Sequence, residues 1–295
     1  MLEQQTQAWS IRDLMKFTID HLQRHGFDEA RLTVELLLSH ALQCQRIELY
    51  THFEKPLSND ELKSFRHLYE RRLAHEPVQY IVGTTSFMGL QFAVDKRVFI
   101  PRPETETLVE QVMMKCSLRA AGEETHILDV GTGSGNIAVS IAKLVRKTWI
   151  ASIDRSAEAL EVAQTNARSH GVTESIAFEN ANFFEPLESR FTQQFDFLVS
   201  NPPYVSIQEW QKLDPEVRQF EPKQAVSDEN DGYEFYHRIG EVARQLVRQG
   251  GWVIVEVGHG QAERVSQLFR AASFTEISVV NDLQEIPRVV LGRCS

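Results

Sequence analysis

Strand and helix signals alternate from His126 to the end of the chain, and this alternation restricts the fold more than any other feature. Short apolar segments typical of buried strands are separated by segments whose apolar residues recur at helical spacing. The predicted strands are 126–130, 149–154, 175–178, 195–200, 252–257, 277–280 and 289–291, and the predicted helices are 105–114, 136–145, 156–170, 233–248 and 261–272. This order predicts a Rossmann-like α/β fold with an open, mostly parallel, seven-stranded sheet covered by helices on both faces. Ligands of such sheets bind beyond the carboxyl ends of the strands.

The residues that precede the sheet predict a helical unit of their own. Ser10 is expected to cap a first helix that stops at Gly26, and Asp28 is expected to cap a second. Ser58 and Glu61 match a capping box at the start of a third helix. These segments carry apolar residues at helical spacing, and none of them has the spacing of a catalytic motif.

A segment rich in β-branched and aromatic residues, 80–100, follows the helical unit and predicts a β-hairpin. We therefore expect a helical substrate-recognition domain over 1–76, a hairpin linker over 77–103 and a larger catalytic α/β domain over 104–295. His21 and His25 have the i, i+4 spacing of a metal clamp, but no third ligand accompanies them, so we expect no metal site.

The net charge and the cysteine content indicate which cellular compartment and which kinds of partner to expect. The chain has 31 Lys and Arg against 41 Asp and Glu, a net charge of −10, which argues against direct nucleic-acid binding through phosphates. Its three cysteines are far apart and form no disulfide framework. The N-terminal residues lack the pattern of a signal peptide, and no stretch approaches the roughly 20 apolar residues that span a bilayer. We expect a cytoplasmic monomer that does not bind a membrane.

A glycine-rich turn follows the first predicted strand and opens a helix. It reads Asp129-Val130-Gly131-Thr132-Gly133-Ser134-Gly135. Glycine permits positive φ and a close approach of a ligand to the backbone, while free N–H groups at a helix start favour an anionic group. Asp154 ends the next strand, where a carboxylate can accept both hydroxyls of a ribose. Because the pattern is G-x-G-x-G, this turn by itself leaves NAD and S-adenosylmethionine both open.

A second motif, Asn201-Pro202-Pro203-Tyr204, follows the strand over 195–200. Two prolines fix two φ angles and remove two donors, so the Pro202 carbonyl is held as an acceptor beside the Asn201 side-chain oxygen. These two acceptors suit an –NH2 group, with the Tyr204 ring against the flat group that bears it. An amide nitrogen needs such orientation because its lone pair is delocalised, and placement of two reactants can lower a barrier by up to ~7–11 kcal/mol. The motif favours methyl transfer from S-adenosylmethionine to an amide or amine nitrogen.

Together these motifs resemble those of the PrmC/HemK family, the N5-glutamine methyltransferases of bacterial class I peptide chain release factors. The resemblance rests on GTGSG, Asp154, NPPY, IPRPETE (Ile100 to Glu106), QFEP (219–222) and the helical N-terminal unit, and it covers the chain from about Leu14 to Gly292. NPPY is shared with adenine-N6 DNA methyltransferases, whereas IPRPETE beside NPPY is far more specific.

The resemblance implies that the substrate is the glutamine of a release factor's Gly-Gly-Gln loop and that the cofactor is S-adenosylmethionine. The implied cofactor-binding residues are Gly131, Thr132, Gly133, Ser134, Gly135, Asp154, Asn182, Phe183 and Asn201. The implied substrate-binding residues are Asn201, Pro202, Pro203 and Tyr204, of which Asn201, Pro202 and Tyr204 are catalytic. Asn182 stands where the family has an acid, and Phe183 is expected to pack against the adenine.

Other functions and other residue roles stay open at this point. The chain could act on a ribosomal-protein glutamine, or on adenine in DNA, although the latter needs a target-reading domain and a basic channel that we do not find. A non-enzymatic nucleotide-binding role would require an inert NPPY. Arg102 and Glu104 either order the domain joint or form a surface ion pair. Glu221 is expected to brace the NPPY loop or to cap a helix, and Glu256 to contribute to the site or to structure.

Overall fold

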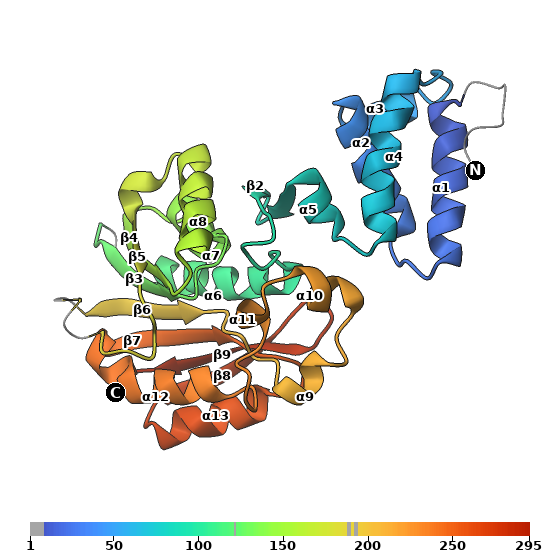
Figure 1. Cartoon of the computed structure of the whole chain (residues 1–295). Helices are drawn as coiled ribbons and strands as arrows, with labels where there is room; N and C mark the ends of the chain where they lie inside the picture. Colours follow the sequence, from blue (N-terminus) through green and yellow to red (C-terminus); the bar gives the residue numbers. More distant parts are fainter. Residues whose placement is uncertain (1–8, 121, 188–189, 192–193) are drawn as a thin grey trace. The chain divides into compact units, whose positions relative to one another are not determined.

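The computed structural model describes residues 9–120, 122–187, 190–191 and 194–295 (Figure 1). Residues 1–8, on which the expectation of no signal peptide rests, lie outside the described part. The chain divides into two compact units between Gly83 and Thr84. The three-segment division predicted from the sequence stays a prediction about where the functional domains lie.

The first unit is a helical bundle. Its helices are α1 (Ile11–Arg24), α2 (Ala30–Leu42), α3 (Arg46–Thr51), α4 (Asn59–Leu73) and α5 (Val78–Val82). Ser10 caps α1 by accepting the Asp13 N–H, and the predicted capping box forms at the start of α4. Asp28 does not cap α2: the cap position is Glu29, which has a φ of 48° and no side-chain cap bond. Nδ1 of His21 lies 2.8 Å from the Tyr69 hydroxyl, which gives this histidine a structural partner.

The second unit contains the predicted seven-stranded sheet. Its strands are β3 (Thr125–Val130), β4 (Thr148–Asp154), β5 (Ile176–Asn180), β6 (Phe195–Ser200), β7 (Val247–Glu256), β8 (Thr275–Asn281) and β9 (Pro287–Arg293). They lie in the order β5-β4-β3-β6-β7-β9-β8, and β9, which is antiparallel to both β7 and β8, runs opposite to the other six strands. Along the chain, β4 and β5 are added on one side of β3, and β6 is then placed on its other side. The crevice between β3 and β6 is therefore the topological switch point, where such sheets bind ligands.

Two helical layers bury the two faces of this sheet (Figure 1). The covering helices are α6 (Glu106–Ser117), α7 (Asn136–Leu144) and α8 (Ala157–His170) on one face, and α12 (Glu234–Leu246) and α13 (Ala262–Ala271) on the other. Side chains alternate along each strand, so Ile127 joins one core and Leu128 the other. This double burial explains why the strands read as continuous apolar segments.

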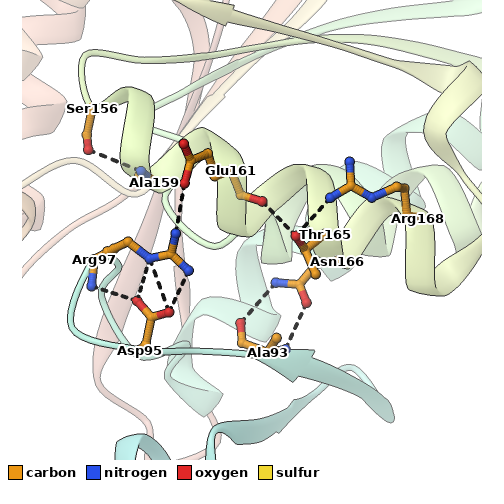
Figure 2. A network of polar contacts seen from close by, with 9 residues as sticks. All are labelled: Ala93, Asp95, Arg97, Ser156, Ala159, Glu161, Thr165, Asn166 and Arg168. Carbon is orange, nitrogen blue, oxygen red and sulfur yellow. Dashed lines mark hydrogen bonds and ion pairs between the residues drawn. The ribbon is translucent and has the colours of Figure 1, made fainter.

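The predicted hairpin is shorter than expected from sequence. It comprises β1 (Thr84–Phe87) and β2 (Leu90–Ala93), whereas Tyr80 belongs to α5. Asn166 of α8 accepts the Ala93 N–H and donates to the Ala93 carbonyl, and Arg97 pairs with Asp95 and Glu161 (Figure 2). These contacts attach the end of the hairpin and the segment that follows it to α8.

Candidate active site

A cavity of about 370 Å³ opens at the carboxyl ends of β3 and β6. Val130 and Ser200, the last residues of these strands, are paired, and the Ser200 hydroxyl donates to the Val130 carbonyl at 2.8 Å. The glycine turn follows one strand and NPPY follows the other, so the two motifs meet in one cavity. Of the residues predicted for the site, those that line it are Gly131, Thr132, Gly133, Ser134, Asp154, Asn182, Phe183, Asn201, Pro202, Pro203 and Tyr204.

The three glycines of the turn have positive φ angles of 75°, 53° and 78°, as the sequence predicted. They serve two purposes. Gly131 and Gly133 face open space, so a ligand can reach their backbone. Gly135 does not line the cavity: a Cβ there would lie 3.0 Å from the Cβ of Ala163. The missing side chain of Gly135 lets α7 pack against α8, and the predicted contact of this residue with the cofactor stays a prediction.

Asp154 holds the turn and faces the cavity. Its Oδ2 accepts the Gly133 N–H at 2.9 Å, and its Oδ1 accepts the Ser156 N–H at 2.9 Å. Burial raises the pKa of Asp154, and these two N–H groups oppose that rise. A carboxylate has about four acceptor positions, so each oxygen can still accept a hydroxyl from a ligand in the cavity.

Buried side chains hold the turn from behind, and sequence reasoning missed two of them, Ser152 and Asn166. Thr132 Oγ1 lies 2.7 Å from the Ser152 hydroxyl, which donates to Asp129 Oδ2 at 2.9 Å. Burial raises the pKa of Asp129 to about 6. On the other side, Asn166 donates to the Ser134 carbonyl at 2.8 Å as well as to Ala93 (Figure 2 shows the Ala93 side of this contact). The hairpin and the glycine turn are thus fastened to the same side chain.

The far end of the cavity is aromatic. Phe183 is mostly buried, with its ring 6.3 Å from the ring of Phe235 and nearly parallel to it. The more exposed Phe184, which sequence reasoning did not select, also lines the cavity. Asn182 accepts the Phe184 N–H at 3.1 Å through its side-chain oxygen. An aromatic end, an acid in the middle and a backbone turn beyond it suit an adenosine that carries an amino-acid chain.

The NPPY segment is held from several sides. Asn201 Nδ2 donates to the Thr105 hydroxyl at 3.1 Å, which leaves Oδ1 free to accept. Gln261 donates to the Tyr204 carbonyl at 2.9 Å. Gly232 lies so close to this loop that a Cβ would come within 2.5 Å of the Tyr204 carbonyl oxygen. Burial raises the pKa of the Tyr204 hydroxyl, which keeps it protonated.

Two buried acids connect segments that are far apart in sequence. Glu221 accepts the Ile100 N–H at 3.1 Å and pairs with Arg102, so it braces IPRPETE rather than NPPY. Arg102 pairs with this acid and not with Glu104, so the alternative of a surface ion pair is wrong. Glu256, at the end of β7, lines the cavity, and the Tyr204 hydroxyl lies 3.4 Å from its Oε1.

The fold has counterparts among solved structures. The catalytic domain of hMettl16 in complex with a MAT2A 3′UTR hairpin aligns with a TM-score of 0.56 over 70% of this chain and 76% of that chain, at 14% identity. Human methyltransferase 10 domain containing protein aligns with a TM-score of 0.54 over 78% and 98%, at 12% identity. A methyltransferase-domain family matches residues 121–285. The fold and the cavity define a Rossmann-like, S-adenosylmethionine-dependent methyltransferase.

Relatives identify the family within this class. The chain is 41% identical to a release factor glutamine methyltransferase of Geobacter sulfurreducens, over 99% of both chains. It is 42% identical to a protein of the same name from Chlorobaculum tepidum, over 95% of this chain and 96% of that one. The PrmC N-terminal domain family matches residues 13–83. The chain belongs to the release factor glutamine methyltransferase family.

Proposed function

We propose that the enzyme methylates N5 of the glutamine in the Gly-Gly-Gln motif of class I peptide chain release factors. The observation that carries this proposal is the orientation of Asn201. Because its Nδ2 is used by Thr105, its Oδ1 is the atom left to accept a hydrogen bond. The names of the relatives support the same substrate.

The proposed residue roles follow from the cavity lining. S-adenosylmethionine supplies a methyl group on a positively charged sulfur. Gly131, Gly133 and Asp154 hold this cofactor by its amino-acid chain and its ribose, and Phe183 packs near its adenine. These assignments suit the free backbone of the turn and the acceptor capacity of the acid.

On the substrate side, Asn201 Oδ1 and the Pro202 carbonyl accept the two amide hydrogens of glutamine. Pro203 and Tyr204 flank the amide plane. Two fixed acceptors orient the amide nitrogen without moving during the reaction, which is the source of their effect on rate. After methyl transfer the amide nitrogen would carry two hydrogens and a positive charge. One of these protons would then leave to solvent, because the Asn201 and Pro202 oxygens accept hydrogen bonds but are too weakly basic to keep a proton.

Location and partners complete the proposal. Among the described residues, no helix has the length and apolarity to cross a membrane. We infer that the enzyme works in the cytoplasm as a monomer, with the helical unit contributing to release-factor recognition. The acidic net charge supports a protein substrate over a nucleic acid.

Isotope-labelled S-adenosylmethionine tests the proposal when the enzyme is incubated separately with a class I release factor, a ribosomal protein that carries a methylatable glutamine, and adenine-containing DNA. Label is expected on the release factor alone, and peptide mass spectrometry should place it on the Gly-Gly-Gln glutamine. A release factor with glutamate in place of that glutamine is the matched control and should stay unlabelled. Label on DNA or on the control release factor contradicts the proposed substrate.

A further inference from the structure

The Asn201 carboxamide works only in one of its two orientations. An oxygen that faces the cavity accepts from a substrate amide, whereas an NH2 group would oppose it. The contact of Nδ2 with Thr105 Oγ1 at 3.1 Å gives the productive orientation. A hydroxyl can accept or donate, however, so Thr105 alone fits either orientation. Whatever fixes the hydroxyl hydrogen of Thr105 therefore fixes the amide.

Glu256 is the group placed to do this. It is 1% exposed, and its Oε1 is near the Tyr204 hydroxyl. Its Oε2 is buried without a well-formed hydrogen bond among the described residues. The Thr105 hydroxyl, itself 1% exposed, contacts Asn201, which follows Ser200, and Ser200 pairs with Val255, the residue before Glu256. This hydroxyl is also one of the groups that lower the pKa of the Glu256 carboxyl. An ionised carboxylate only accepts, so it draws the Thr105 hydrogen and leaves the Thr105 lone pairs for Asn201.

We propose that Glu256 and Thr105 are positioning residues that fix the polarity of the Asn201 carboxamide. This inference rests on the proposed function. In the competent state the hydrogen bonds run from Asn201 Nδ2 to Thr105 and from Thr105 to the Glu256 carboxylate. A proton on Glu256 allows the reverse chain, in which Glu256 donates to Thr105, Thr105 donates to Asn201 Oδ1, and the NH2 group faces the cavity. The switch needs only a proton from solvent and a turn of the amide.

The surroundings of Glu256 put this switch near neutral pH. Burial raises the pKa of Glu256 to about 7, and Glu104 adds to the rise. Arg288 of β9 and the hydroxyls of Thr105 and Tyr204 oppose it. Above pH 7 the carboxylate predominates and the amide is held in its productive orientation. Below pH 7 the acid predominates, so the methylation rate should fall as the pH falls.

Two variants of Thr105 separate positioning from packing. Thr105→Val keeps the volume and loses the hydroxyl, whereas Thr105→Ser keeps the hydroxyl and loses the methyl group. We expect Thr105→Val to lower kcat by at least about tenfold and Thr105→Ser to stay within about threefold of wild type, because only the hydroxyl carries the hydrogen bond. Both should bind S-adenosylmethionine with wild-type Kd. If Thr105 is needed only for packing, Thr105→Ser should lower kcat more than Thr105→Val, and that result overturns the inference.

The pH profile of kcat tests whether Glu256 is the group whose protonation lowers the methylation rate. Between pH 8 and pH 6 the wild-type kcat should fall about tenfold, as expected for one group of pKa about 7. Glu256→Gln cannot titrate, and its amide oxygen can accept from Thr105 at either pH, so its profile should be flat. An unchanged fall in Glu256→Gln rules out Glu256 as the switch.

Nuclear magnetic resonance tests the amide without substrate. In protein labelled with nitrogen-15 at asparagine, the Asn201 side-chain signals, assigned with Asn201→Ala, should titrate near pH 7 in wild type and not in Glu256→Gln. Titration in an enzyme that labels no release factor would refute the proposed function and leave the polarity inference standing. If the enzyme labels release factor, but the Asn201 signals do not titrate and the two Thr105 variants have equal kcat, the polarity inference is refuted and the proposed function stands.

Discussion

Replacing Asn201 with alanine removes one of the two acceptors that are proposed to hold the substrate amide. The structure suggests the size of the effect. Asn201 lines the cavity with its Nδ2 bonded to Thr105, and the carbonyl of the next residue, Pro202, is a backbone atom that the substitution leaves in place. Loss of one fixed hydrogen-bonding group at a reacting atom costs about 3–4 kcal/mol, or 10²–10³ in rate. We expect kcat of Asn201→Ala to fall by about this factor.

The same substitution should leave cofactor binding almost intact. In the part of the chain that the structure describes, the Asn201 side chain bonds to Thr105 and not to the turn that is proposed to hold the cofactor. A change of less than about 0.7 kcal/mol, or threefold in Kd, is expected for S-adenosylmethionine. Calorimetric titration gives this Kd, and single-turnover methylation of a release factor at saturating cofactor gives the rate of the chemical step.

Asn281→Ala is the matched control, because Asn281 is exposed on the edge strand β8 and its side chain, among the described residues, bonds to Glu285 alone. It should have wild-type kcat and Kd. If Asn201→Ala keeps more than about a tenth of the wild-type rate, the amide clamp is wrong, since one-tenth corresponds to only about 1.4 kcal/mol. A large loss of cofactor affinity with normal single-turnover rate would place Asn201 in the cofactor site instead.

Three further substitutions test the supports of the site. Gly133→Val should abolish S-adenosylmethionine binding in calorimetry, because it puts a branched side chain on the open face of the turn at a φ of 53°. Asn166→Ala should lower the free energy of unfolding in urea by about 2–4 kcal/mol, since it leaves the Ser134 carbonyl and two backbone groups of the hairpin unpaired, and weaker cofactor binding should accompany it. Glu221→Gln should cost about 1–2 kcal/mol in the same assay, less than a fully buried pair because Arg102 is partly exposed. An effect below about 0.5 kcal/mol in either urea experiment would contradict the support assigned to that residue.

Local sequence was sufficient wherever the physical cause is local. Strand segments buried on both faces are mostly apolar, and caps such as Ser10 act within one turn of their own helix. The positive φ of the turn glycines is likewise a property of the residue type. The end of helix α12 at Leu246 could not be predicted in this way. Val247 already pairs with Phe195 across an irregular register, so β7 begins where the predicted helix was still continuing.

The site shows the same division. Each of its two motifs is a continuous stretch of sequence, and the order of the strands brings the two motifs to one crevice. The residues that hold the motifs come from elsewhere: Thr105 lies 96 positions from Asn201, and Gln261 lies 57 positions from Tyr204. No local pattern indicates such partners. The close packing of Gly135 against Ala163 could not be predicted for the same reason, because Ala163 approaches Gly135 only after α7 and α8 have packed.

By itself, the sequence determined the α/β class, the places of the glycine turn and NPPY at strand ends, and the chemistry of an amide held by two acceptors. These follow from hydrophobic periodicity and from the backbone limits of glycine and proline, which act over a few residues. Only the tertiary structure decided which way the Asn201 amide points and which buried acid lies behind it. That choice depends on hydrogen bonds between segments that lie 96 and 52 positions apart in the chain, and packing alone brings those segments within reach.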